Sequence, residues 1–434
     1  MKVNISFAEH LKKYLDDKTI SDLLSSLAKD EIKGLFLNER IIDSKTMVDN
    51  FPFLRHHPLV NNAFIYDKNE CEMSHHYLYA LGTFYIQEPS SCLTASLVKF
   101  TDGDLILDMC AAPGGKAISL ACRNPHGVVV ANDISKERID ALINNIERMG
   151  IDNVAITNND FTNSDIARTF KDRFDAILLD APCSGSGMFR KMKEMRDDWT
   201  YAKVIRCQEI QKKLIINAYQ MLKPGGCLVY STCSYSCEEN EEIVKFLLSK
   251  TDAQVLNIDD SKLFYKSGRD GAGIHLFPNL YPGEGQYIAR LVKPGIKNKT
   301  LYKSVSQKDE NVLHYRLESR DNIATFNALY SLNKRFDYKP LRIVRYGVKA
   351  LERKGDELVP THHLARCGLS LHTIAIASND FLSYVSGREI IIKTNFKGWA
   401  IATYNGLNIG LIKIASNRAK NHYPKGLRFN KLIM

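Results

Sequence analysis

Apolar residues in the middle of the chain fall into short runs that are separated by amphipathic stretches. Five runs have the length and the polar borders of buried strands, and they are residues 105–110, 127–133, 154–160, 174–180 and 225–233. Between residues 135 and 150, apolar positions instead recur every three or four residues, which predicts a helix that ends at Gly150. Strands that alternate with helices predict an α/β fold with a parallel sheet over residues 77–294.

The segments before this core are more mixed. Residues 86–100 combine Pro89 with a helical pattern, and Ser90 and Ser91 are the candidate caps of that helix. Residues 1–76 contain two or three amphipathic helical stretches and some strand-like sequence. We therefore expect an N-terminal α+β domain over residues 1–76.

The C-terminal part changes to strand-like runs with polar borders. Two of these runs are separated by Asn405-Gly406, a pair that favours a tight hairpin turn. We expect a small β-rich module over residues 371–434. A polar, basic intermediate segment over residues 295–370 is expected to join this module to the core.

Lys and Arg are concentrated in the C-terminal third of the chain. Residues 291–434 hold 25 basic and 10 acidic residues, a net charge of +15, whereas residues 1–290 hold 34 and 39, a net of −5. This asymmetry indicates a polyanionic partner that is contacted from the C-terminal side. Because no apolar run approaches about 18 residues and no signal-peptide pattern begins the chain, we expect a cytoplasmic protein without membrane contacts.

The cysteines and histidines do not follow a metal-binding pattern. The ten cysteines contain no C-x-x-C pair, which predicts reduced thiols rather than a disulfide framework. Paired histidines occur at 56–57, 75–76 and 362–363 without the ligand spacing of a structural zinc site. We expect no bound metal.

A small-residue turn between a strand and a helix, in residues 107–121, is a candidate ligand site. Small residues let the backbone approach a ligand, and the helix start presents unpaired amides. The turn lacks the phosphate-loop and dinucleotide-loop patterns. Asp133 lies 23 residues beyond Cys110, close to the roughly 20 residues at which an acid binds ribose hydroxyls, and Asp160 ends the third strand. A cationic nucleoside without phosphate, such as S-adenosylmethionine, fits these features.

Asp180, Cys183 and Cys233 all fall at or just past the ends of predicted strands. A thiolate that adds to carbon 6 of cytosine activates carbon 5 toward a methyl donor. A carboxyl group at ring N3 eases this addition, and a base must then remove the carbon 5 proton. The alternatives are two inert buried thiols and a redox pair, which predicts a disulfide on mild oxidation.

Three motifs resemble the Nol/Nop/Sun family of RNA cytosine-5 methyltransferases, and within it the bacterial 16S rRNA methyltransferase F group. They are DMCAAPGGK (108–116), DAPCSGSGMFRK (180–191) and GGCLVYSTCSYSCEENEEIV (225–244). Residues 82–93 resemble the family's lead-in helix, and residues 397–428 resemble its PUA-like RNA-binding module. The resemblance implies a Rossmann-like class I methyltransferase core between an N-terminal RNA-binding-type α+β domain and a C-terminal PUA-like module.

The resemblance also implies roles for single residues. Cys233 falls on the nucleophile that bonds carbon 6, Cys183 on the cysteine that assists release, and Asp180 on the acid that holds N3. The implied S-adenosylmethionine-binding residues are Cys110, Ala111, Ala112, Pro113, Gly114, Gly115, Lys116, Asp133, Arg138, Asp160 and Asp180. Ala117 replaces a common threonine, and SGSG replaces the more frequent SGEG, without loss of a catalytic group. The Pro-Cys motif of DNA cytosine-5 methyltransferases would instead make Cys183 the attacking group.

The expected reaction is methylation of cytidine in RNA, with 16S rRNA or the small ribosomal subunit as the partner. A tRNA methyltransferase and a non-catalytic ribosome-assembly factor are the alternatives, and we expect no DNA binding and a monomer. Two basic stretches are candidate RNA contacts. The first combines Arg190, Lys191, Lys193 and Arg196 with Phe189 and Trp199, and the second is residues 417–428.

Overall fold

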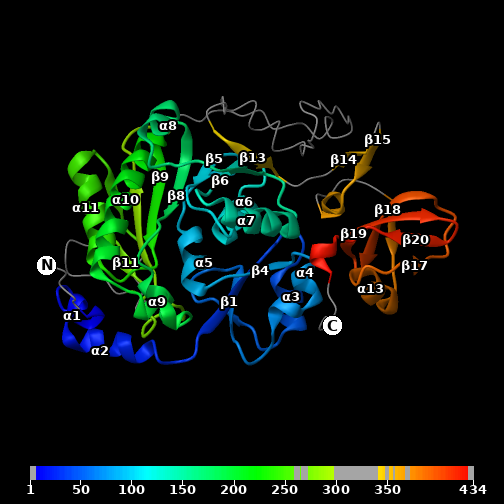
Figure 1. Cartoon of the computed structure of the whole chain (residues 1–434), viewed down its shortest axis with the longest axis horizontal. Coiled ribbons are helices and arrows are strands. Elements are labelled where there is room, and N and C mark those ends of the chain that lie inside the picture. Colours follow the sequence, from blue (N-terminus) through cyan, green and yellow to red (C-terminus); the bar gives the residue numbers. More distant parts are fainter. Residues whose placement is uncertain are drawn as a thin grey trace.

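The computed structural model describes residues 6–258, 264, 272–297, 341–347, 351–354, 357–366 and 372–428. Most of the expected intermediate segment, residues 295–370, lies outside these ranges. Figure 1 shows a central α/β core, with the N-terminal part beneath it and the C-terminal module beside α3 and α4. In the described part of the chain, no helix is both long enough and apolar enough to cross a membrane.

All five predicted strands form one parallel set within a larger sheet. In spatial order they are β9 (Leu222–Thr232), β8 (Phe174–Asp180), β5 (Leu105–Asp108), β6 (Val128–Asn132) and β7 (Val154–Thr157). Antiparallel strands flank this set on both sides. On one side, β12 (Tyr287–Val292) pairs with β9 and also with the short strands β10 (Gln254–Leu256) and β11 (Ile274–His275). On the other side, β13 (Ile343–Tyr346) pairs with β7. The predicted α/β core is confirmed.

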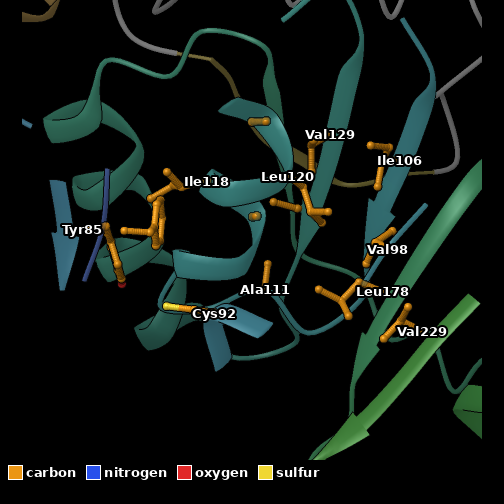
Figure 2. Close-up of a cluster of buried hydrophobic side chains, with 14 of the residues drawn as sticks. Tyr85, Cys92, Val98, Ile106, Ala111, Ile118, Leu120, Val129, Leu178 and Val229 are labelled. Atoms are coloured by element: carbon orange, nitrogen blue, oxygen red, sulfur yellow. The ribbon is translucent and has the colours of Figure 1, made fainter. Parts of the chain in front are cut away.

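Two apolar clusters cover the two faces of this sheet. Alternate residues of a strand point to opposite faces, so Ile106 enters one cluster while Leu105 and Leu107 enter the other. The first cluster, part of which Figure 2 shows, is formed with α5 (Pro89–Ser96), α6 (Gly115–Cys122) and α7 (Lys136–Met149). The second is formed with α8 (Ser164–Thr169), α10 (Tyr201–Met221) and α11 (Glu241–Lys250). The core is therefore a sheet between two layers of helices.

The helix ends show where local sequence rules suffice. Helix α7 begins after Ser135, whose side chain accepts from the Arg138 amide, and ends at Gly150 in the left-handed region, as predicted. In α5, Pro89 takes the first helical position as expected. The predicted serine caps are wrong, because the Glu88 carboxylate accepts from the amides of Ser90 and Ser91.

The N-terminal part contains helices α1 (Phe7–Leu11), α2 (Asp17–Ser26), α3 (Ser44–Asn50) and α4 (Tyr77–Ala80) and the short η1 (Met73–His75). Its sheet has the order β2 (Arg55–His56), β3 (Ala63–Asp67), β1 (Ile32–Leu37) and β4 (Phe84–Ile86). Strand β4 lies beyond residue 76, and the division of the chain into four domains stays a prediction.

The C-terminal module is a five-stranded sheet with one helix. The strands follow the order β16 (Thr373–Ala375), β18 (Gly398–Tyr404), β19 (Leu407–Ala415), β20 (Arg418–Asn421) and β17 (Ile390–Ile391), beside α13 (Ser378–Val385) and η6 (Lys425–Leu427). Asn405 and Gly406 both have positive φ between β18 and β19, so the predicted hairpin is confirmed. Before the module lie β14 (Leu351–Lys354), β15 (Glu357–Pro360) and η5 (His362–Arg366). Tyr77 of α4 packs edge-on against Phe381 and Tyr404, which joins the module to the N-terminal part.

Candidate active site

The carboxyl ends of the parallel strands bring the predicted catalytic residues to one edge of the sheet. Asp180 ends β8, and Cys183 follows it by three residues. Cys233 directly follows Thr232, the last residue of β9. Beyond Cys183 the chain forms η2 (Ser186–Met188) and α9 (Lys193–Asp197), and beyond Cys233 it forms η3 (Cys237–Glu239).

The two cysteines form a contacting pair of thiols. The distance between Cys183 Sγ and Cys233 Sγ is 3.1 Å, and both residues are half-buried. The hydrogen bond with Cys233, together with burial, raises the pKa of the Cys183 thiol well above its ordinary value. Cys183 is therefore held as a neutral thiol that can exchange a proton with its neighbour.

Asp180 is fixed by three donors. Its Oδ1 accepts from Ser231 Oγ at 2.6 Å and from Gln286 Nε2 at 2.8 Å, and its Oδ2 accepts from Lys116 Nζ at 2.8 Å. Burial lowers the pKa of Lys116, but the charge and hydrogen bond of Asp180 outweigh it and leave the pKa above its usual value. The carboxyl group is thus held in one orientation near the thiols.

Ser231 and Gln286 are contacts that the sequence did not reveal. Ser231 precedes Cys233 by two residues, so its place beside the catalytic motif was a usable signal. Gln286 comes just before β12, more than 100 residues after Asp180, and only the antiparallel return of β12 brings it to the site.

The small-residue turn, residues 110–116, lies beside Asp133. Gly114 has a φ of 117°, a conformation that favours glycine, and α6 begins directly after it. Asp133 Oδ2 accepts from the Ala112 amide at 3.2 Å and lies 3.3 Å from Nη1 of Arg138, which also donates to the Ala112 carbonyl. Asp133 and Arg138 therefore hold the turn in place.

The acids at the neighbouring strand ends differ in exposure. Asp160 is exposed after β7, where its Oδ1 accepts from the amide and hydroxyl of Thr162. Asp108 ends β5 with a fully buried carboxyl that has no hydrogen-bond partner among the described residues. Burial raises the pKa of Asp108 to about 7. The sequence reasoning missed Asp108, although it ends β5 just as Asp180 ends β8.

The two aromatic residues of the first predicted RNA-contact stretch, Phe189 and Trp199, are buried, so the stacking role predicted for them is wrong. Phe189 and Trp199 pack edge-on against Phe7 of α1. Arg190 makes a two-pronged ion pair with Glu284, at 2.8 and 2.9 Å, and both side chains are buried. Of the other basic residues in the stretch, Lys191 and Arg196 remain exposed.

On three adjacent strands of the C-terminal module, two lysines and a tryptophan form a row that we call the basic row. Its residues are Trp399, Lys413 and Lys420. These residues face one another across β18, β19 and β20, and the two lysines are exposed. The Lys413 ammonium lies 5.3 Å from the centre of the Trp399 ring, and His422 packs edge-on against that ring. Tyr423, by contrast, is buried in the module's core.

Two separate parts of the chain match known protein families. Residues 95–292 match the family described as 16S rRNA methyltransferase RsmB/F, and residues 371–429 match the methyltransferase RsmF PUA domain. The ribosomal RNA small subunit methyltransferase F of Psychromonas ingrahamii is 34% identical over 81% of this chain and 81% of its own length. The protein of the same name from Vibrio campbellii is 32% identical over 80% and 79%.

Solved structures share the fold. A methyltransferase homolog protein from Pyrococcus horikoshii has a TM-score of 0.58 and 27% identity, and the match covers 66% of this chain and 94% of that one. NSun6 from the same organism, solved with SFG, has a TM-score of 0.60 and 21% identity over 67% and 98% of the two chains. Because the two curated relatives are 34% and 32% identical to this chain over about four-fifths of its length, the chain belongs to the family of the ribosomal RNA small subunit methyltransferases F.

Proposed function

We propose that this chain transfers a methyl group from S-adenosylmethionine to carbon 5 of a cytidine in 16S rRNA. The observation that carries the proposal is the contact between Cys183 and Cys233 at 3.1 Å, beside Asp180 and at the edge that also holds the small-residue turn. A thiol pair with a carboxyl group meets the needs of cytosine activation, which are a nucleophile, a proton acceptor and a hydrogen bond to the ring.

The donor set of the turn suits S-adenosylmethionine. Asp108 provides a fully buried carboxyl without a hydrogen-bond partner among the described residues, and Asp133 lies beside the turn. Acidic groups around a turn without a phosphate-binding pattern favour a cation over a nucleotide phosphate. The cofactor supplies a methyl group on a positively charged sulfur, and residues 110–116 with Asp133, Arg138, Asp160 and Asp180 would hold it.

The chain's own residues carry the remaining chemistry. The Cys233 thiolate would form a bond to carbon 6, and the electron pair of the C5–C6 double bond would then bond the methyl group at carbon 5, while the bond between that methyl group and the sulfonium sulfur breaks and leaves a neutral thioether. A proton on Asp180 would let its carboxyl group donate to the N3 lone pair, which draws charge from carbon 6 and orients the ring toward Cys233. A base then takes the carbon 5 proton, the electron pair of that C–H bond restores the C5–C6 double bond, and the bond between sulfur and carbon 6 breaks to return the Cys233 thiolate. Cys183, 3.1 Å from Cys233, is placed to assist this release.

RNA is the substrate that the family and the charge distribution support. The curated relatives are named as methyltransferases of the small ribosomal subunit RNA, and the PUA-matching module carries the basic row. A paired base does not expose carbon 6 to a thiolate, so the target cytosine must be unpaired or flipped out.

Methyl transfer with cysteine variants tests this function. The full-length wild type, Cys233→Ala, Cys183→Ala and the control Cys71→Ala, which lies in the N-terminal part, would be given labelled S-adenosylmethionine and rRNA, small subunits or tRNA. We expect the wild type to place the label in rRNA or in small subunits. Cys233→Ala should be inactive and form no covalent adduct with RNA. Cys183→Ala should give a covalent RNA adduct that is visible on denaturing gels. Cys71→Ala should match the wild type.

Three outcomes would change the proposal. An adduct in Cys233→Ala together with an inactive Cys183→Ala without adduct would reverse the cysteine roles. Label in tRNA alone would move the substrate from rRNA to tRNA. No label from the wild type on any of the three RNA substrates would leave an RNA-binding assembly factor as the better function.

A further inference from the structure

We infer that the Glu239 carboxylate is a positioning group that sets the distance between the two active-site thiols. The inference rests on the proposed function, because it concerns the residues that would perform that reaction. Glu239 is the last residue of η3 and is fully buried, so it does not contact solvent.

One carboxylate connects the two cysteine loops. Ser184 directly follows Cys183, and Ser234 directly follows Cys233. Glu239 Oε2 accepts from the hydroxyl groups of both serines, each at 2.5 Å, and the two hydroxyl oxygens lie 3.2 Å apart. Because each serine directly follows a cysteine in the chain, loss of the carboxylate would remove the link that fixes one cysteine loop relative to the other.

Two further donors complete the coordination of Glu239. Its Oε1 accepts from the Ser184 amide at 2.8 Å and from Gln211 Nε2 of α10 at 3.2 Å. An ionised carboxylate only accepts hydrogen bonds, so each of its two oxygens can accept from two of these four donors. A side-chain amide in its place would turn its NH2 group, itself a donor, toward two of the donors. The carboxylate is therefore specific to this position and is anchored to a helix of the core.

Neighbouring residues show that this link belongs to Glu239. Asn240 accepts from Thr232 Oγ1 at 2.6 Å and donates to the Ser234 carbonyl at 2.8 Å, and both of these bonds hold the loop of Cys233. Glu241 is also buried, and its carboxylate pairs with His275 at 2.8 Å. Glu241→Gln is therefore a matched control, because it changes a buried carboxylate two residues away.

Crosslinking of the thiols tests the inference without RNA or cofactor. Dibromobimane joins two nearby thiols, and peptide mass spectrometry identifies the Cys183–Cys233 product. We expect Glu239→Ala to slow this crosslink and Glu239→Gln to have an intermediate rate, while Glu241→Gln keeps the wild-type rate. In methyl-transfer assays we expect a loss of about 100-fold in kcat for Glu239→Ala with little change in KM, because reacting groups that are displaced by about 1 Å lose that much.

Milder variants protect the test against misfolding. Ser184→Ala and Ser234→Ala each remove one hydroxyl from the carboxylate, and we expect both to slow crosslinking less than Glu239→Ala does. Wild-type crosslinking in Glu239→Ala, or equal losses in Glu241→Gln, would overturn the inference. If the wild type methylates no RNA but Glu239→Ala still slows the crosslink, the proposed function fails and the positioning role remains.

Discussion

Asp108 shows how burial gives one residue a pH-dependent effect on stability. Its folded pKa of about 7 lies above the ordinary value, so the native state keeps a proton that the unfolded chain has lost. The free energy of unfolding therefore falls as pH rises through this interval, from about 4 to about 7. At pH 8 the folded protein carries the full cost of a buried charge.

We expect Asp108→Asn to stabilise the protein at pH 8, because the amide has no charge to bury. The gain in the free energy of unfolding should be at most about 4 kcal/mol at pH 8 and clearly smaller at pH 5. Urea unfolding at the two pH values measures it, with Asp140→Asn on the exposed side of α7 as the control. Equal gains at both pH values would contradict the role of the Asp108 charge.

Site residues that lie at the ends of predicted strands could be predicted from the sequence. Site residues that lie on other segments of the chain could not. Asp180, Cys183 and Cys233 follow strands that the apolar runs define, so the sequence could place them on one edge. Gln286 reaches the site because β12 returns antiparallel to β9, and Glu239 reaches it in the turn after β9, and no periodic pattern marks either residue. Glu88 caps α5 in place of the serines because its carboxylate reaches two amides at once.

At the scale of elements, the packing of α1 against Phe189 and Trp199 explains why these two aromatic residues do not stack on RNA bases. Phe7 brings the N-terminal helices against Phe189 and Trp199, a long-range contact that local sequence does not encode. The same packing encloses Arg190, whose ion pair with Glu284 ties this stretch to the segment before β12. Phe189, Arg190 and Trp199 are thus interior side chains, whereas Lys191 and Arg196 stay at the surface.

We expect Arg190→Ala to lower the free energy of unfolding by about 3–5 kcal/mol, because it leaves the buried Glu284 charge unpaired. Arg196→Ala, an exposed change in the same stretch, should change it little. Urea unfolding at pH 7 compares the two. Unchanged stability together with weaker RNA binding for Arg190→Ala would return this residue to the RNA surface.

For the whole molecule, the uneven charge predicts an RNA affinity that depends on the C-terminal module. Lys413 and Lys420 lie side by side on its exposed face with Trp399, and phosphate contacts release counterions on binding. We expect Lys413→Glu with Lys420→Glu to weaken RNA binding and to reduce the slope of log affinity against log salt by about one per lysine.

Affinity measured from low to physiological salt provides the check, and Lys18→Glu on α2 is the control outside the module. A wild-type affinity that hardly changes with salt would remove the module from the RNA surface. The sequence could locate the basic part of the chain, residues 291–434, but not the basic row of Trp399, Lys413 and Lys420. The pairing register of β18, β19 and β20 decides which side chains share a face of the sheet.

Strand β13 has a consequence for how the chain can be divided. It is supplied by residues far beyond the methyltransferase motifs, and it pairs with β7, whose residues are all buried. A fragment that ended at residue 297 would leave the outer amides and carbonyls of β7 without this partner. Unpaired apolar strands recruit strands of other molecules. By covering β7, the segment that contains β13 therefore also protects residues 1–297 from self-association. The part of the chain before residue 297 and the part after it are best produced as one polypeptide.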